Sequence, residues 1–332
     1  MKTPPYWYRK DNERQGLQEV LLSPVAPVYT AISNIHRSFK KTYKSKLPVI
    51  CVGNITAGGS GKTPAAIALM QYVKANKIAR KPFFLTRGYG GKLNGTLVDS
   101  RIDSVKDVGD EALLLAKYAP TIVASDREEG AKIAEAMFAD LIIMDDGMQN
   151  PGLHKDLVFM VVDGKKGFGN GKMIPAGPLR QPINNGIEAA DIFIIINDDE
   201  RGVSAYLPKN KPQLSGKIIS TKKLDKKAKY LAFAGLAHPD KFYNTAKKKG
   251  LILEEQKSFP DHYVYSKSDI RKLFKKAEKE DLKLLTTEKD IVRIPAEYHE
   301  KIETLPVELH IQPYEIVLDA LAHLIEGYRN VE

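Results

Sequence analysis

Apolar runs recur along the middle of the chain and alternate with segments whose apolar positions have helical spacing. Each run is short, rich in β-branched or aromatic residues, and apolar at consecutive positions. Such strands, separated by helices, predict a parallel sheet that helices cover on both sides, with ligands at the carboxyl ends of its strands. The strand-like runs are KPFFLTR, PTIVAS, ADLIIMDDG, DLVFMVVDG and ADIFIIIND, and the helical stretches between them are GDEALLLAKYA and REEGAKIAEAMF.

The pattern changes between residues 200 and 230, where NKPQLSGKIISTKKLDKKAK is rich in lysine and poorer in apolar residues. This change predicts a linker. Beyond it, the strand-like runs KYLAFAGLA, LKLLTTE and PVELHIQ alternate with helical segments over 239–249, 267–279 and 314–328, and predict a smaller α/β domain. We expect an N-terminal segment over 1–46, a core domain over 47–210 and a C-terminal domain over 211–332, whose last helix can return to the core.

Residues 18–46 place an apolar stripe beside a basic cluster. The stripe consists of Val28, Ile32, Ile35 and Phe39 at helical spacing, and the cluster consists of Lys40, Lys41, Lys44 and Lys46. One interpretation is an amphipathic helix that lies in the membrane headgroup plane, with its lysines on anionic lipid. The other is a helix whose apolar side packs on the protein's own core. The sequence alone favours neither.

The stretch GNITAGGSGKTP, from Gly53 to Pro64, lies between a predicted strand and a predicted helix. Its end matches a phosphate-binding P-loop, although Thr56 occupies the place of the first glycine of the usual pattern. Such a loop turns backbone amides toward an anion at a helix N-terminus and adds a lysine and a hydroxyl. We therefore predict a nucleotide site in a P-loop NTPase-like fold, against the alternative of a glycine-rich turn that binds nothing. Its candidate residues are Gly58, Gly59, Ser60, Gly61, Lys62 and Thr63.

The run ADLIIMDDG places Asp145 and Asp146 at the carboxyl end of a predicted strand. This arrangement is similar to a Walker B motif, in which a carboxylate binds magnesium together with the loop hydroxyl, here that of Thr63. Two adjacent carboxylates repel each other, so a cation would stabilise the pair. The alternative is a plain turn at the end of a strand, but the loop upstream favours the metal.

Three further stretches offer four candidate residues, and those in the last two stretches carry little weight by themselves. Arg87, in TRGYGG, follows another strand-like run and could clamp a phosphate. Asp110 and Glu111 stand in the first turn of a predicted helix, where acidic residues are common for capping and dipole reasons. His262, in FPDHYVY, is one of seven histidines and could equally be a packed or exposed loop residue.

Composition excludes several classes of protein. The 332 residues are 43% hydrophobic and 28% charged, as in a globular protein with room for two cores. With Cys51 as the one cysteine, neither a disulfide framework nor a Cys/His metal cluster can form. The net charge of +10 favours an anionic partner. Nucleic acid is the least favoured choice, because the lysine runs lack interleaved aromatic residues.

The N-terminus carries charge, at Arg9, Lys10 and Asp11, where a signal peptide would have an apolar core, and no apolar run approaches the length of a membrane span. We therefore expect a cytoplasmic protein.

Eight stretches in this order resemble the tetraacyldisaccharide 4'-kinases, which phosphorylate the 4'-hydroxyl of an acylated glucosamine disaccharide in lipid A biosynthesis. They are VGNITAGGSGKTP, TRGYGG, VGDEALLLA, IIMDDGMQN, PAGPLRQP, LAFAGLAHPDKF, FPDHYVY and LLTTEKDIVR. Together with the N-terminal amphipathic segment they extend over nearly the whole chain. The family's loop has the same displaced glycine, here Gly53, so the loop resembles that family's variant of the P-loop.

The resemblance implies a kinase that uses ATP and Mg²⁺ and assigns roles to particular residues. The family's catalytic aspartate falls on Asp110, which would accept the proton of the sugar hydroxyl, and its partner histidine falls on His262, which would position and tune that carboxylate. Domain closure is expected to bring the two together. The remaining roles fall on Lys62 and Arg87 for charge on the phosphates, and on Thr63, Asp145, Asp146 and Gln149 around the magnesium ion.

The resemblance also implies an acylated disaccharide 1-phosphate as acceptor, and a monomer at the cytoplasmic face of the inner membrane, on an anionic surface. Two positions depart from the family pattern. Asn150 replaces a histidine and Gln181 replaces a glutamate, which puts a second or outer magnesium contact in doubt.

The main alternative is a membrane-surface P-loop ATPase switch, such as a partitioning or metal-delivery protein. Its loop normally carries a further lysine before the glycines, where this chain has Ala57. Guanine specificity is not indicated, because NDDE at Asn197 lacks the lysine of the Asn-Lys-x-Asp motif.

Overall fold

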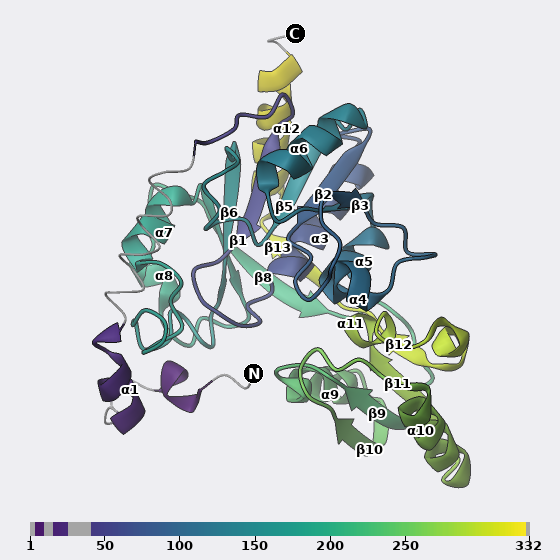
Figure 1. Cartoon of the computed structure of the whole chain (residues 1–332). Helices are drawn as coiled ribbons and strands as arrows, with labels where there is room; N and C mark the ends of the chain where they lie inside the picture. Colours follow the sequence, from purple (N-terminus) through teal and green to yellow (C-terminus); the bar gives the residue numbers. More distant parts are fainter. Residues whose placement is uncertain (1–3, 10–15, 26–40, 330–332) are drawn as a thin grey trace.

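The structure, a computed structural model, describes residues 4–9, 16–25 and 41–329. Two sheets dominate it, the larger at the centre of Figure 1 and the smaller below it. Within the described residues the larger sheet has nine strands, and those from β8 to β4 run parallel, with an antiparallel strand at each edge. In spatial order they are β13 (Glu308–Gln312), β8 (Gln213–Ile219), β7 (Ile192–Ile196), β6 (Leu157–Asp163), β1 (Val49–Gly53), β5 (Leu141–Asp145), β2 (Pro82–Thr86), β4 (Thr121–Val123) and β3 (Thr96–Leu97).

Helices cover both faces of the larger sheet, because its strands are apolar on both sides. Along β1, Ile50 and Val52 join the core on one face, whereas Val49 and Cys51 join the core on the other. The first face carries α3 (Lys62–Ala75), α5 (Asp110–Ala116) and α12 (Tyr314–Arg329), and the second carries α6 (Arg127–Ala136), α7 (Ile183–Ala189) and α8 (Val203–Tyr206). The short helix α4 (Val105–Val108) precedes α5. The predicted α/β fold is confirmed.

The smaller sheet is parallel and also has helices on both faces. Its spatial order is β10 (Ile252–Ser258), β9 (Lys229–Ala234), β11 (Lys283–Thr287) and β12 (Glu303–Leu305). Helix α9 (Pro239–Lys248) packs on one face and α10 (Lys267–Lys279) on the other. After β11 come α11 (Glu288–Ile291), which packs against α5, and the 3₁₀ helix η2 (Ala296–Lys301).

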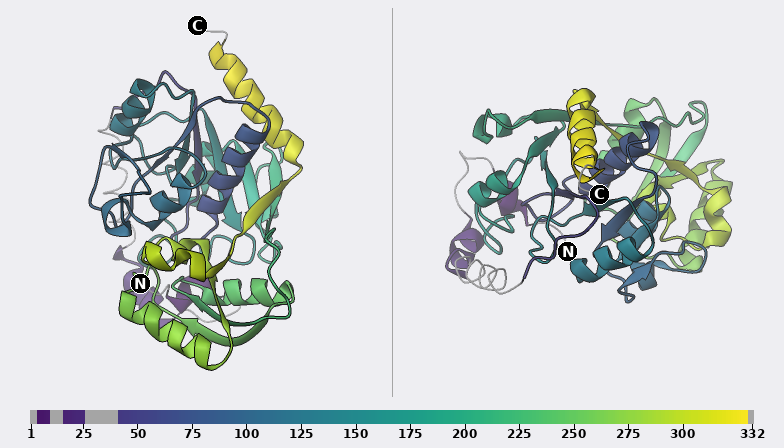
Figure 2. Two further views of the ribbon diagram at one scale, coloured as in Figure 1. Left: turned by 90° about the vertical axis from the view of Figure 1, so that its right-hand side faces the viewer. Right: turned by 90° about the horizontal axis from the view of Figure 1, so that it is seen from above.

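The larger sheet extends past residue 210, where we expected the core domain to end. The expected linker over 200–230 contains α8 and β8, and β8 pairs with β7. The run PVELHIQ, expected in the smaller domain, forms β13 at the edge of the larger sheet, antiparallel to β8. Helix α12 then runs beside α3 (Figure 2), with Val317 and Leu321 in the same core as Leu69. Pairing between distant segments decides this arrangement, which local composition does not reveal.

The described part of the N-terminus forms hydrogen bonds and an ion pair with the loop that follows β6. In η1 (Pro5–Tyr8), the carbonyl of Trp7 accepts from the Asn170 amide at 2.8 Å, and the Trp7 indole donates to the Pro175 carbonyl at 3.2 Å. In α1 (Leu17–Leu22), the fully buried Glu19 carboxylate pairs with Arg9 at 2.9 Å and Lys172 at 3.2 Å. Residues 5–8 thus lie beside the segment that follows the carboxyl end of β6 in the larger sheet.

The predicted amphipathic stripe, Val28 to Phe39, and Lys40 lie outside the described residues. Lys41, Lys44 and Lys46 are exposed and lie in a non-helical connection that leads to β1. In the part of the chain that the structure describes, none of the helices has the length and apolar character needed to cross a membrane.

Candidate functional site

The glycine loop follows β1 at the carboxyl edge of the parallel strands, where the pattern places it. Gly61 has φ of +85° and caps α3, so the chain turns sharply into the helix that begins at Lys62. A Cβ on Gly53 would lie 2.5 Å from the Cβ of Met148, so this displaced glycine is required by close packing against the segment after β5. The loop is also held from the side, because Ala57 N donates to Pro178 O and Arg180 N to Ile55 O, both at 2.7 Å.

The two aspartates at the end of β5 have different partners. Asp146 lies 3.6 Å from the Lys62 ammonium and accepts from Arg180 at 2.8 Å. Burial opposes ionisation, but Lys62 and Arg180 outweigh it and hold the pKa of Asp146 below its usual value. Asp145 instead accepts from the Thr63 hydroxyl at 2.9 Å.

Asp145 Oδ1 is buried and accepts no hydrogen bond from any described residue. Burial, and then the nearby carboxylates Glu111 and Asp146, raise the pKa of Asp145 to about 7. A buried carboxylate oxygen without a donor, beside a hydroxyl at the phosphate loop, fits a hard cation such as Mg²⁺. No group of three or more His, Cys, Asp or Glu side chains suited to a metal occurs in the described residues, so phosphate and water would complete the coordination.

Gln149 lies near this pair but is engaged elsewhere. Its amide donates to the Asn54 carbonyl at 2.8 Å and lies 3.4 Å from the amide oxygen of Gln181, which is buried. These contacts hold the loop, and the assignment of Gln149 to the metal stays a prediction.

Asp110 and His262 are hydrogen bonded, although Asp110 lies on a helix that covers the larger sheet and His262 follows a strand of the smaller sheet. Nδ1 of His262 donates to Oδ2 of Asp110 at 2.9 Å. Asp110 is buried in the first turn of α5, whereas His262 follows β10 and keeps 39% of its side chain exposed. The contact is already made, so the domain closure expected from the sequence is not needed to form it.

Arg293 binds the same aspartate, and the sequence pattern assigned it no role. Its Nε donates to Asp110 Oδ2 at 2.7 Å and its Nη2 reaches the same oxygen. Burial opposes ionisation of Asp110, but the hydrogen bond from His262 and the charge of Arg293 hold its pKa well below the usual range. Arg293 lies in LLTTEKDIVR, and this motif was the one signal that pointed to it.

The same motif places a second charged pair across the junction of the two sheets. Lys289 in α11 donates to Glu111 at 2.8 Å, and Glu111 is close enough to Asp145 to raise its pKa. Glu111, for which the sequence suggested only a capping or dipole role in the first turn of a helix, therefore belongs to the electrostatics of the site.

Two predicted site residues have side chains without a partner in the described part of the chain. Arg87 is exposed after β2, and no hydrogen bond or ion pair joins it to another described residue. Ser60 Oγ, in the glycine loop, is buried and unpartnered among the described residues. Both lie at strand ends on the phosphate side of the sheet, with donors available to a ligand.

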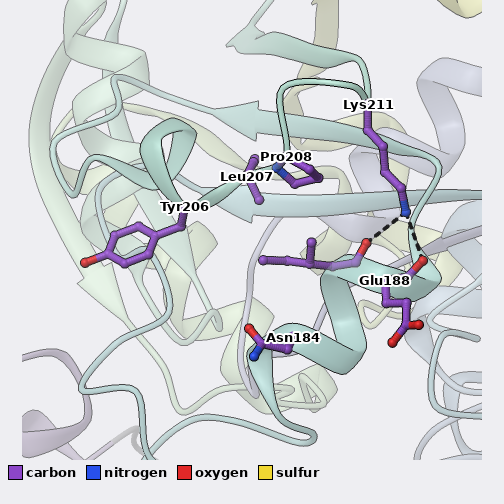
Figure 3. A pocket seen from close by; sticks show the side chains of 7 residues that line it. Asn184, Glu188, Tyr206, Leu207, Pro208 and Lys211 are labelled. Carbon is purple, nitrogen blue, oxygen red and sulfur yellow. Dashed lines mark hydrogen bonds between the residues drawn. The ribbon is translucent and has the colours of Figure 1, made fainter.

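A separate hollow lies between α7 and the segment after α8 (Figure 3), with a volume of about 490 Å³. None of the predicted site residues lines it. Lys211, on its wall, donates to the carbonyls of Glu188 at 2.9 Å and Ile187 at 3.1 Å, and so stabilises the end of α7. We assign the hollow no part in the site.

Comparisons with known proteins identify the family of this chain. The family model of the tetraacyldisaccharide-1-P 4'-kinases matches residues 18–325. The tetraacyldisaccharide 4'-kinase of Rhodospirillum centenum is 37% identical over 331 residues, 98% of each chain. That of Paramagnetospirillum magneticum is 42% identical over 315 residues, 93% of this chain and 94% of the relative.

Among solved structures, LpxK from Aquifex aeolicus, crystallised in complex with ATP, has a TM-score of 0.77 at 28% identity, over 93% of this chain and 99% of that one. These matches confirm the resemblance seen in the eight stretches. The chain belongs to the tetraacyldisaccharide-1-P 4'-kinase family.

Proposed function

We propose that this protein transfers the γ-phosphate of ATP to the 4'-hydroxyl of an acylated disaccharide 1-phosphate, the reaction that its family's name describes. It is accordingly a kinase of lipid A biosynthesis. The observation that carries the proposal is the Asp110–His262 hydrogen bond at the same sheet edge as the glycine loop. Phosphoryl transfer needs little more from a protein than held phosphates and an oriented hydroxyl.

The glycine loop and Lys62 are proposed to hold the phosphates. Backbone amides before α3, with the positive end of that helix, suit an anion, and the Lys62 ammonium would exchange its contact with Asp146 for phosphate oxygens. Magnesium, when bound, supplies charge neutralisation of the phosphates. Thr63 and Asp145 are the residues that we propose to hold it, with Asp146 and Gln149 nearby, and Arg87 would reach the phosphates from the side.

The geometry around Asp110 suggests how the proton of the acceptor hydroxyl is taken. Oδ2 of Asp110 accepts from both Arg293 and His262, so this carboxylate is a weak base. The other ring nitrogen of His262, Nε2, points away from Asp110 and lies 3.9 Å from Asp261. We propose that Nε2 takes the hydroxyl proton while Asp110 fixes the ring and stabilises its protonated form. From the sequence we expected the reverse, with Asp110 taking the proton and His262 positioning the carboxylate.

Association with the cytoplasmic face of the inner membrane is also proposed. Helix α1 exposes Val20 and Leu21, and Val25 just beyond it is exposed as well. Lys41, Lys44 and Lys46 are exposed nearby in the sequence, where they could contact anionic headgroups. We further propose a monomer, since the loop, Asp110 and His262 all come from one chain.

The test is transfer of labelled γ-phosphate from Mg-ATP to a tetraacylated disaccharide 1-phosphate in mixed detergent micelles, with Lys62→Ala as the inactive control. Label at the 4'-position supports the proposal. Hydrolysis of ATP without labelled lipid would contradict it and favour the ATPase switch.

A further inference from the structure

Three basic side chains that the proposed reaction does not use meet at the carboxyl end of β6. Lys166 comes from the segment after β6, and His238 and Lys241 come from the start of α9 in the smaller unit. Lys166 Nζ donates to His238 Nε2 at 2.8 Å, and Lys241 Nζ lies 2.8 Å from Oδ2 of Asp163. We call Lys166, His238 and Lys241 the basic cluster.

The basic cluster carries an uncompensated positive charge. Asp163 is occupied by Lys241 and by the Asn197 amide, which donates to Oδ1 at 3.0 Å. Lys166 has no carboxylate partner among the described residues, and its ammonium lies 5.0 Å from the centre of the Tyr8 ring. Burial, and then Lys241, lower the pKa of Lys166 to about 8. A partly buried cation without a counter-ion is stabilised by an anionic ligand.

The position of the basic cluster relates it to both halves of the site. Tyr8, beneath Lys166, also donates to the Ala57 carbonyl of the glycine loop at 3.2 Å. His238 and His262 follow the ends of β9 and β10, which are paired so that Ala234 faces Ser258. Asp261 acts electrostatically on His238. The basic cluster and the Asp110–His262 pair therefore both lie at the carboxyl edge of the smaller sheet, and Tyr8 connects the basic cluster to the glycine loop.

We propose that the basic cluster binds the phosphate that the acceptor already carries, at the end of the disaccharide opposite the reacting 4'-hydroxyl. The inference rests on the proposed function. The nucleotide phosphates already have the glycine loop, Lys62 and Thr63, so a second site suits a second phosphate. An acceptor that spans the edge from His262 to Lys166 would present both its ends to groups that fit them. The α9 N-terminus, where His238 makes no side-chain cap, adds a favourable dipole for the anion.

The test compares two acceptors, with and without the 1-phosphate, in wild type and in Lys166→Gln. Wild type should have the lower KM for the phosphorylated acceptor. Lys166→Gln should raise that KM about tenfold, because a hydrogen bond between charged groups is stronger than one between neutral groups. The KM for ATP and the KM for the unphosphorylated acceptor should not change. Lys166→Arg should restore part of the discrimination.

Lys165→Gln is the matched control. Lys165 is adjacent, exposed and paired with Glu200 at 3.0 Å, so the variant makes the same charge change outside the basic cluster. It should behave as wild type.

Three results would overturn the inference. They are a rise in the KM for ATP alone, an equal rise for both acceptors, and no change in Lys166→Gln. In each of them wild type still phosphorylates the acceptor, so the proposed function stands. Failure of that function would instead appear as an unlabelled acceptor in wild type.

A binding measurement tests the basic cluster even if wild type does not phosphorylate the acceptor. Trp7, the single tryptophan, precedes Tyr8, so its fluorescence should report titration with glucosamine 1-phosphate. A saturable change that Lys166→Gln loses and Lys165→Gln keeps supports the site, and an equal response in both variants contradicts it.

Discussion

Arg293 Nε lies 2.7 Å from Oδ2 of Asp110, the oxygen that also accepts the hydrogen bond of His262. Arg293 follows α11 of the smaller unit and its side chain is fully buried, and Asp110 opens α5 on the larger sheet. One buried ion pair thus joins the two units and sets the charge of the proposed active site.

Arg293→Met should therefore lower both stability and turnover. Removing one partner of a buried pair leaves the other charge uncompensated, at a cost of about 3–5 kcal/mol. The pair contributes stability above the ordinary pKa of an aspartate, and this contribution is lost as pH falls through the lowered pKa of Asp110. Nearly all of this loss falls below about pH 4, so thermal unfolding should be compared between pH 7 and about pH 2.5, and the variant should lose less stability than wild type over this range. Arg271→Met, on the exposed side of α10, is a control for loss of an arginine, and equal effects of the two variants would contradict the prediction.

Lys62→Ala should abolish phosphate transfer, because its ammonium is proposed to hold the phosphates, and it should leave the fold intact, because Asp146 keeps its ion pair with Arg180. Turnover in micelles and the far-ultraviolet circular dichroism spectrum check the two halves of this prediction. Lys74→Ala, at the other end of α3, removes the same charge and should retain turnover. Near wild-type activity in Lys62→Ala would remove the phosphate-loop hypothesis.

Asp110→Asn and His262→Ala should each lower kcat by about 10²–10⁴-fold, with much smaller changes in the KM for ATP. If the two residues act as one unit, the double variant should lose little more than the worse single variant. A fully additive loss would show that they act independently, and unchanged turnover in Asp110→Asn would return that residue to a helix-capping role.

Gly53→Ala should destabilise the protein, because the new methyl group would lie 2.5 Å from the Cβ of Met148. Overpacking of this kind costs about 1–3 kcal/mol. Gly59→Ala is the matched comparison in the same loop, since a Cβ there would meet nothing within 4 Å. Thermal unfolding should separate the two variants, and equal melting temperatures would refute a packing role for Gly53.

The acceptor kcat/KM should fall as pH rises above about 8, because Lys166 loses its charge there. The groups that face Lys166 do not cancel this effect. Lys241 stays paired with Asp163. Burial, and then the charges of Lys166 and Lys241, lower the pKa of His238, so it does not titrate in this range. Burial, and then the charge of Asp163, raise the pKa of Tyr8 to about 12, which is above this range. Lys166→Gln should lack the decline, and a decline that persists in it would assign the titration to another group.

The features that the sequence predicted well depend on near neighbours in the chain. The strand, glycine loop and helix from Val49 to Ala75 were recognisable from a consecutive apolar run, glycine spacing and helical periodicity. The same holds for α9, α10 and α12. Strand β10 was missed because ILEEQKS is largely polar and exposed, and β8 was read as a linker because lysines dominate its surroundings.

The sequence by itself determined the α/β class, the phosphate loop, the paired aspartates and, through resemblance, the family and the Asp110–His262 pair. Each of these is encoded in a contiguous stretch whose local geometry follows from its own residues. Only the tertiary structure decided that β13 and α12 return to the larger sheet, that Arg293 shares an oxygen with His262, and that Lys166 meets His238. Those contacts join residues far apart in the chain. They form because each sheet folds around its own buried core, and the loops at the ends of the strands of the two sheets then meet.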